Sequence, residues 1–152
     1  MRDLNLPSFE AKIRKKNDIV EIFDPLRKKY VMLTPEEWVR QHFVQYLIAE
    51  KQYPGSLIAN ETGIKLNSLV KRCDTVIYNR QLEPLMIIEY KRPDVMITQD
   101  VFDQITRYNS VLKVPYLVVS NGITHHCCRL NYEYLSYEYL TEIPPYSEIS
   151  IQ

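Results

Sequence analysis

Two acidic residues and a lysine stand near the ends of apolar runs in RCDTVIYNRQLEPLMIIEYKRPD, residues 72–94. The run LMIIEYK carries Glu89 and Lys91 two positions apart, so in a β-strand their side chains share one face while Tyr90 points the other way. Asp74 lies in the preceding apolar-leaning run. If the two runs pair through their short connection, we expect Asp74 to lie beside Glu89.

Such a pair of acids favours metal chemistry. Neighbouring carboxylates repel each other and are costly to bury, and a divalent cation between them removes this cost. Their hard oxygens suit Mg²⁺, which keeps its remaining positions for water or phosphate. A lysine beside the metal stabilises developing charge or orients the attacking water, so Asp74, Glu89 and Lys91 predict phosphodiester hydrolysis. The alternative is an ordinary Glu89–Lys91 ion pair that closes a strand.

The surrounding sequence predicts the elements that position these residues. A helix is expected over 34–53, because Thr34 suits the N-cap, Pro35 suits the first helical position and Glu37 completes a capping box. A second helix is expected over 98–113, with Val101, Ile105, Tyr108 and Leu112 on its apolar stripe. Strands are expected at 56–62, 70–78, 84–91, 115–122 and 124–131, after two short strands around the Asp24-Pro25 turn. This order predicts an α/β domain with a mixed central sheet.

The same motifs resemble a known nuclease superfamily. Asp74 followed by Glu89-Tyr90-Lys91 resembles the PD-(D/E)xK signature, with Cys73 in place of the namesake proline. The ordered set TPEEWVRQ, KRCDTVIY, IIEYKRP, QITRY and LVVSNG resembles the N-terminal nuclease domain of type I restriction enzyme R subunits. The resemblance implies a restriction-endonuclease-like core of helix, three strands, helix and strand. It also implies DNA cleavage with Mg²⁺ (Mn²⁺ as a substitute) and partner subunits of a restriction-modification complex.

The resemblance assigns Asp74 and Glu89 as metal ligands and Lys91 as the catalytic lysine. The backbone carbonyl of Tyr90 is a further candidate ligand. Such nucleases often carry a glutamate on the first helix, where this chain offers two. Glu36 is favoured because Val39, Phe43 and Leu47 lie within about 60 degrees of it on the helix, and Glu37 is the alternative.

Other side chains are candidates for supporting roles. A Glu36–Arg40 pair at i, i+4 is equally compatible with a plain surface ion pair. Gln104 and Tyr108 resemble the Q-x-x-x-Y motif of recombination-type nucleases, which implies that they line the DNA face. Arg72 and Arg92 flank the proposed site and are candidates for phosphate contacts.

Composition limits the class of protein. The 152 residues carry 19 basic and 19 acidic side chains, which excludes a strongly cationic nucleic-acid coat. Three cysteines, two of them adjacent, favour a reducing, cytoplasmic compartment, and no apolar run is long enough for a membrane helix. We expect one domain over 1–152, with an N-terminal β extension (1–33), a core (34–122) and a C-terminal strand and tail (123–152).

HHCC at 125–128 alternates between strand faces, so we expect partly buried strand residues rather than a zinc site. No G-x-x-x-x-G-K-[ST] loop occurs, so an ATP-driven motor is not expected within these residues. A non-catalytic DNA-binding or adaptor module, or a structural interaction domain, is therefore the competing functional hypothesis. The sequence specifies neither the preferred DNA structure nor the oligomeric state.

Overall fold

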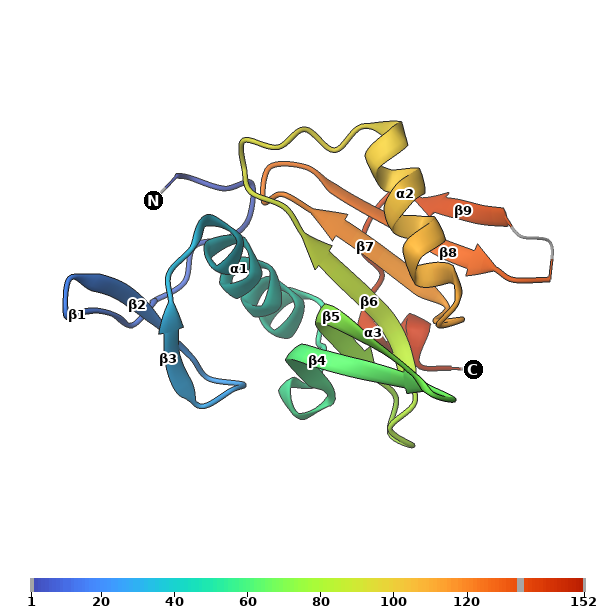
Figure 1. The fold of residues 1–152 in the computed structure, drawn as a ribbon, viewed down its shortest axis with the longest axis horizontal. Coiled ribbons are helices and arrows are strands. Elements are labelled where there is room, and N and C mark those ends of the chain that lie inside the picture. Colours follow the sequence, from blue (N-terminus) through green and yellow to red (C-terminus); the bar gives the residue numbers. More distant parts are fainter. Residues whose placement is uncertain (1, 134–135, 152) are drawn as a thin grey trace.

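The computed structural model describes residues 2–133 and 136–151, which fold around a six-stranded mixed sheet (Figure 1). A smaller three-stranded sheet precedes it. The strands are β1 (Ile13–Lys16), β2 (Ile19–Asp24), β3 (Lys29–Met32), β4 (Ile58–Leu66), β5 (Leu69–Tyr78), β6 (Pro84–Tyr90), β7 (Tyr116–Ser120), β8 (His125–Asn131) and β9 (Ser136–Leu140). The helices are α1 (Pro35–Glu50), the 3₁₀ turn η1 (Gly55–Leu57), α2 (Gln99–Ser110) and α3 (Tyr146–Ile149).

The large sheet has the strand order β4-β5-β6-β7-β8-β9. Only β6 and β7 run parallel, and they are joined by the crossover through α2, while the other neighbours are antiparallel. The predicted order of helix, three strands, helix and strand is confirmed as α1, β4–β6, α2 and β7.

Two apolar cores lie on opposite faces of the large sheet. Residues of α1 pack on one face with Ile88 and Tyr90 of β6, whereas Phe102 of α2 packs on the other face with Ile87. The expected strand β8 is confirmed, and its adjacent cysteines divide between the two cores, as strand alternation requires. Glu89 lies two positions after Ile87 on β6, so its side chain lies on the same face of the sheet, the one covered by α2.

Helix α1 begins as predicted, but its capping box does not form. The Thr34 hydroxyl accepts a hydrogen bond from the Glu37 amide at 3.0 Å. The Glu37 carboxylate is buried and instead accepts hydrogen bonds from Arg27 and Gln41. A buried charge needs such partners, and they compete successfully with the helix N-terminus for this side chain.

The structure corrects three other expectations. The N-terminal extension has three strands rather than two. The additional strand, β1, is not predicted from the sequence because its exposed residues lack the apolar alternation that identifies a strand. β4 and β5 are longer than expected and meet at a two-residue turn, where Asn67 adopts φ 56°. In α2 the buried residues are Phe102 and Asn109, whereas Tyr108, expected on the apolar stripe, is 57% exposed. None of the described helices is long and apolar enough to span a bilayer.

Candidate functional site

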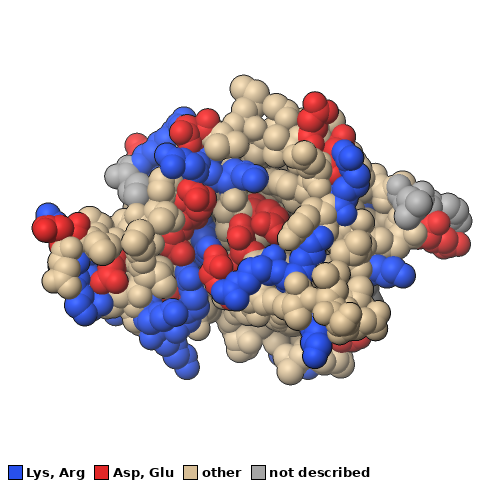
Figure 2. Space-filling model, in the orientation of Figure 1, with Lys and Arg blue, Asp and Glu red and all other residues tan. Residues whose placement is uncertain are grey.

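A cavity of about 600 Å³ lies between α2 and the strands β5 and β6. It brings together most of the residues predicted from the sequence, from parts of the chain that are far apart. Figure 2 shows acidic side chains near the middle of this face, between α1 and α2, with basic side chains bordering them. The cavity is lined by Arg72, Asp74, Glu89, Lys91, Gln104, Ile105, Tyr108 and Asn109.

The two acids are held side by side by the β5–β6 pairing. Thr75 lies opposite Ile88, so the next positions along the two strands are Asp74 and Glu89. The Tyr90 amide donates a hydrogen bond of 2.9 Å to Asp74 Oδ2, which fixes this carboxylate at the end of β6. The adjacency predicted from the sequence is therefore present.

The pKa of the Glu89 carboxyl is affected by burial and by the neighbouring Asp74. Burial raises the pKa of the Glu89 carboxyl from 4.5 to about 8, and the charge of Asp74 and a hydrogen bond to it act in the same direction. The Lys91 charge opposes this rise in the pKa. Two carboxylates that resist joint ionisation, at the edge of a cavity, are a suitable arrangement of hard oxygen donors for a divalent cation.

We expect the stability of the metal-free protein to fall with pH because of Glu89. Its folded pKa lies above its ordinary value, so the folded state binds this proton more tightly than the unfolded state does. The stabilising contribution is complete below pH 4.5 and is lost as the pH rises toward about 8. Thermal unfolding in a chelator should show this decline, and saturating Mg²⁺ should offset it most at the alkaline end. If the stability of Glu89→Gln falls with pH as much as that of the wild type, another group is responsible for the pH dependence.

Lys91 follows directly at the end of β6 and lines the same cavity. Its backbone amide donates a 2.9 Å hydrogen bond to the Ser120 carbonyl, which ties it to the end of β7. No ion pair joins Lys91 to Glu89 in the described part of the chain, so the simple strand-closing pair does not form. The Lys91 side chain lines the cavity together with the two acids, and its charge acts on Glu89 without a direct ion pair.

Arg40 of α1 anchors the acid-bearing strand from the opposite side. It is 5% exposed, and its Nη1 donates a 2.7 Å hydrogen bond to the backbone carbonyl of Asp74. Its Nη2 lies 2.5 Å from Glu61 Oε1, and its Nε lies 3.3 Å from Glu37 Oε2. The expected pairing of Arg40 with Glu36 is therefore replaced by pairing with two other acids.

We expect Arg40→Ala to destabilise the fold strongly. The substitution leaves Glu37 and Glu61 without a shared cation, and breaking a buried ion pair on one side costs about 3 to 5 kcal/mol. Urea unfolding at neutral pH measures this loss. Arg40→Lys keeps the charge without the planar set of donors, so its loss should be smaller. Equal stabilities of Arg40→Ala and wild type would contradict the anchoring role.

Glu61 is an acid near the site that the sequence did not identify. It adopts φ 52° in β4, where it interrupts the ladder opposite Asp74. Its carboxylate lies between Arg40 and Arg72, with Arg72 Nε at 3.7 Å, and its charge contributes to the raised pKa of Glu89. Nothing in the sequence marks Glu61, because the irregular backbone that turns it toward the site has no distinct motif.

The remaining candidates do not line this cavity. Glu36 has one buried carboxylate oxygen, Oε1, without a hydrogen-bond partner. Both Glu37 oxygens are engaged by Arg27, Gln41 and Arg40. Arg92 pairs with Asp94 at 3.2 Å and borders a separate small hollow. Within residues 2–133 and 136–151, no group of three or more His, Cys, Asp or Glu side chains is arranged to hold a metal ion.

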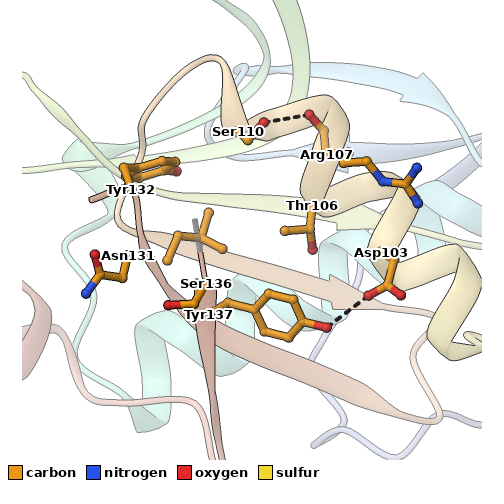
Figure 3. A pocket seen from close by; sticks show the side chains of 9 residues that line it. Asp103, Thr106, Arg107, Ser110, Asn131, Tyr132, Ser136 and Tyr137 are labelled. Carbon is orange, nitrogen blue, oxygen red and sulfur yellow. Dashed lines mark hydrogen bonds between the residues drawn. The ribbon is translucent and has the colours of Figure 1, made fainter. Parts of the chain in front are cut away.

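A second cavity, of about 400 Å³, lies on the other flank of α2, against β8 and β9. Figure 3 shows Tyr137 donating a hydrogen bond to Asp103 and Ser110 donating one to the Arg107 carbonyl. Among the described residues that line it, Asp103 is the one carboxylate. The close acid pair and lysine of the first cavity have no counterpart among these described residues, so we place the candidate site between α2 and β5–β6.

The mixed sheet with its helices on both faces is a restriction-endonuclease-like α/β fold. Residues 35–144, well over half of the chain, match the family described as type I restriction enzyme R protein N terminus (HSDR_N), and the chain belongs to this family.

A solved structure supports the fold. It is a fragment assigned as an HsdR subunit of a type I restriction enzyme from Vibrio vulnificus YJ016, with a TM-score of 0.53 and 18% identity. The similarity covers 77% of this chain and 24% of that one, so the chain spans about a quarter of its structural neighbour. No curated protein matches the chain.

Proposed function

We propose that this chain is a Mg²⁺-dependent endodeoxyribonuclease domain that hydrolyses DNA phosphodiesters. The observation that carries the proposal is the Asp74–Glu89 pair, whose mutual repulsion contributes to the high pKa of Glu89, beside Lys91 in one cavity. Membership in the R-subunit family supports DNA as the substrate and other restriction-modification subunits as partners. The three free, buried cysteines are in keeping with a cytoplasmic location.

The residues of the cavity fit a hard divalent cation. Asp74 and Glu89 would hold Mg²⁺, or Mn²⁺ in its place, and the Tyr90 carbonyl is a candidate for a third protein ligand. Glu36 does not line the cavity, but we keep it as a proposed supporting acid because its buried Oε1 has no hydrogen-bond partner among the described residues. Glu37 is not proposed, since its carboxylate is already saturated by cationic and amide donors. When bound, the ion supplies Lewis acidity toward the phosphoryl oxygen and acidifies a water molecule.

The other side chains of the cavity would orient and stabilise the substrate. Lys91 places its ammonium group where negative charge develops on the phosphorane, or it orients the attacking water. Gln104 and Tyr108 of α2 face the acids across the cavity and would contact the DNA strand on that side. Arg72, whose side chain is 71% exposed, would bind a neighbouring phosphate.

A DNA-cleavage assay tests the proposal. Supercoiled plasmid should be nicked and then linearised with Mg²⁺ or Mn²⁺, and it should stay intact in a chelator. An Asp74→Asn variant prepared in the same way controls for contaminating nucleases. DNA retention by the wild type without metal-stimulated cleavage would reject the enzyme and favour the non-catalytic DNA-binding alternative.

A further inference from the structure

A two-stranded ribbon extends from the large sheet next to the candidate site. The β4–β5 ladder runs from Ile58 paired with Ile77 to Leu66 paired with Leu69, whereas β5 pairs with β6 only over Thr75–Tyr78. Residues 62–73 therefore pair only with each other, and we call this segment the β4–β5 ribbon.

The ribbon is anchored at its base. Ile64 and Cys73 are buried in the core on the α2 side of the sheet. Lys71 Nζ lies 3.3 Å from the ring centroid of Tyr108, which joins the ribbon to α2 at the rim of the cavity. These contacts make the ribbon a fixed extension of the sheet, so its outer residues have a defined position relative to the site.

One face of the ribbon is open to solvent and leads to the cavity. Val70 and Arg72 lie on this face of β5, Lys65 lies opposite Val70 on β4, and Arg72 lines the cavity together with Asp74. Val70 is 64% exposed and lies close over Gly63, where an added Cβ would come within 3.0 Å of it. The open face thus presents an apolar side chain between two cations.

The charge and composition of the ribbon fit DNA. Residues 62–73 contain Lys65, Lys71 and Arg72 and no acid, although the whole chain has no net charge. They also contain no aromatic residue, and aromatic rings are the usual platforms for stacking single-stranded bases. A two-stranded ribbon is narrow enough to enter the major groove of duplex DNA.

Resting on the proposed nuclease function, we propose that the β4–β5 ribbon is an arm that binds duplex DNA beside the cleaved bond. Lys65 and Arg72 contact phosphates, and Val70 contacts the sugars or base edges between them. Val70 and Asp74 are separated by four residues, or about 13 Å along a strand, which equals the axial length of about four base pairs. The arm therefore sets the position of the duplex relative to Asp74 and Glu89.

The test compares duplex binding by two double variants in a Lys91→Ala background, in which cleavage is expected to be absent. Lys65→Ala/Val70→Ser alters the arm. Lys16→Ala/Val20→Ser alters an exposed lysine and valine of the N-terminal sheet and is the matched control. Fluorescence anisotropy across a salt series gives the affinity and its salt dependence, and thermal unfolding checks that each variant folds. Lys65→Ala alone serves as a milder second variant.

The arm variant should bind duplex DNA roughly fivefold to tenfold more weakly at about 0.1 M salt, with a salt slope smaller by about 1, while the control is unchanged. Equal binding by the arm variant and the control would overturn the inference. So would a loss confined to single-stranded DNA, which would contradict the duplex assignment.

The cleavage assay on the wild type separates the two proposals. If the wild type cleaves DNA and the arm variant binds DNA as well as the control, the proposed arm is rejected and the proposed nuclease function is retained. If binding depends on the arm but the wild type does not cleave DNA, the nuclease function is rejected and the arm is retained.

Discussion

Lys91→Ala should lower the rate of DNA cleavage by at least about 10²-fold to 10³-fold, the effect of removing one charge-stabilising donor from an active site. The fold and Mg²⁺ binding should be retained, because Lys91 forms no ion pair with either acid and its backbone hydrogen bond to Ser120 does not depend on the side chain. Loss of cleavage with retained metal binding would place Lys91 at the reacting phosphate rather than among the metal ligands.

Single-turnover cleavage and isothermal titration with Mg²⁺ provide the two measurements for Lys91→Ala. Lys29→Ala, on the N-terminal sheet, is the control for loss of a lysine outside the cavity. Lys91→Arg keeps the positive charge and should retain more activity than Lys91→Ala. Wild-type activity in Lys91→Ala would reject the proposed mechanism even if the protein proved to be a nuclease.

Glu89→Gln should abolish metal-dependent cleavage and at the same time stabilise the metal-free protein at alkaline pH. The amide removes an anionic ligand, so Mg²⁺ binding is lost. It also removes an ionisable carboxyl whose pKa is raised first by burial and then by the charge of Asp74. Activity and stability should therefore change in opposite directions, as expected where a functional site keeps like charges together.

Thermal unfolding in a chelator and the cleavage assay test the two halves of the Glu89→Gln prediction. Above pH 8 the variant should unfold at a higher temperature than the wild type, and below pH 4.5 the difference should vanish. Glu10→Gln, at an exposed position, is the control for loss of an acid far from Asp74. Lower stability of Glu89→Gln throughout this range would show that the two carboxylates do not repel each other in the folded protein.

The central acid pair could be predicted because it depends on short-range rules. The period-2 alternation of β6 places Glu89 and Lys91 on one face, and a short connection between two strands brings Asp74 to the neighbouring position. Helix α1 was predictable for a similar reason, since Thr34, Pro35 and the break after the helix are local signals.

The partners of these residues could not be predicted, because they depend on irregular backbone and long-range pairing. Glu61 faces the site because its own backbone adopts a left-handed conformation in β4. Arg40 contacts Glu61 although the two residues are 21 positions apart in the sequence. Glu37 has a local role as a capping acid in the sequence, yet burial beside Arg27 overrides it. Propensity and spacing do not contain this information.

The β4–β5 ribbon shows the same limit. Its turn, Asn67-Ser68, lacks the glycine that usually marks a two-residue hairpin, so the sequence predicts two shorter strands instead of one continuous ribbon. The position of Lys65, Val70 and Arg72 on one face becomes clear only when the full length of the hairpin is known.

The most direct test of the metal site is a crystal of the wild type soaked in Mn²⁺, measured for anomalous scattering. The account predicts a peak between the carboxylates of Asp74 and Glu89, within about 2.0 to 2.2 Å of an oxygen from each, and no peak in Glu89→Gln crystals soaked in the same way. A wild-type map without a peak at these carboxylates, at a Mn²⁺ concentration that supports cleavage, would contradict the account.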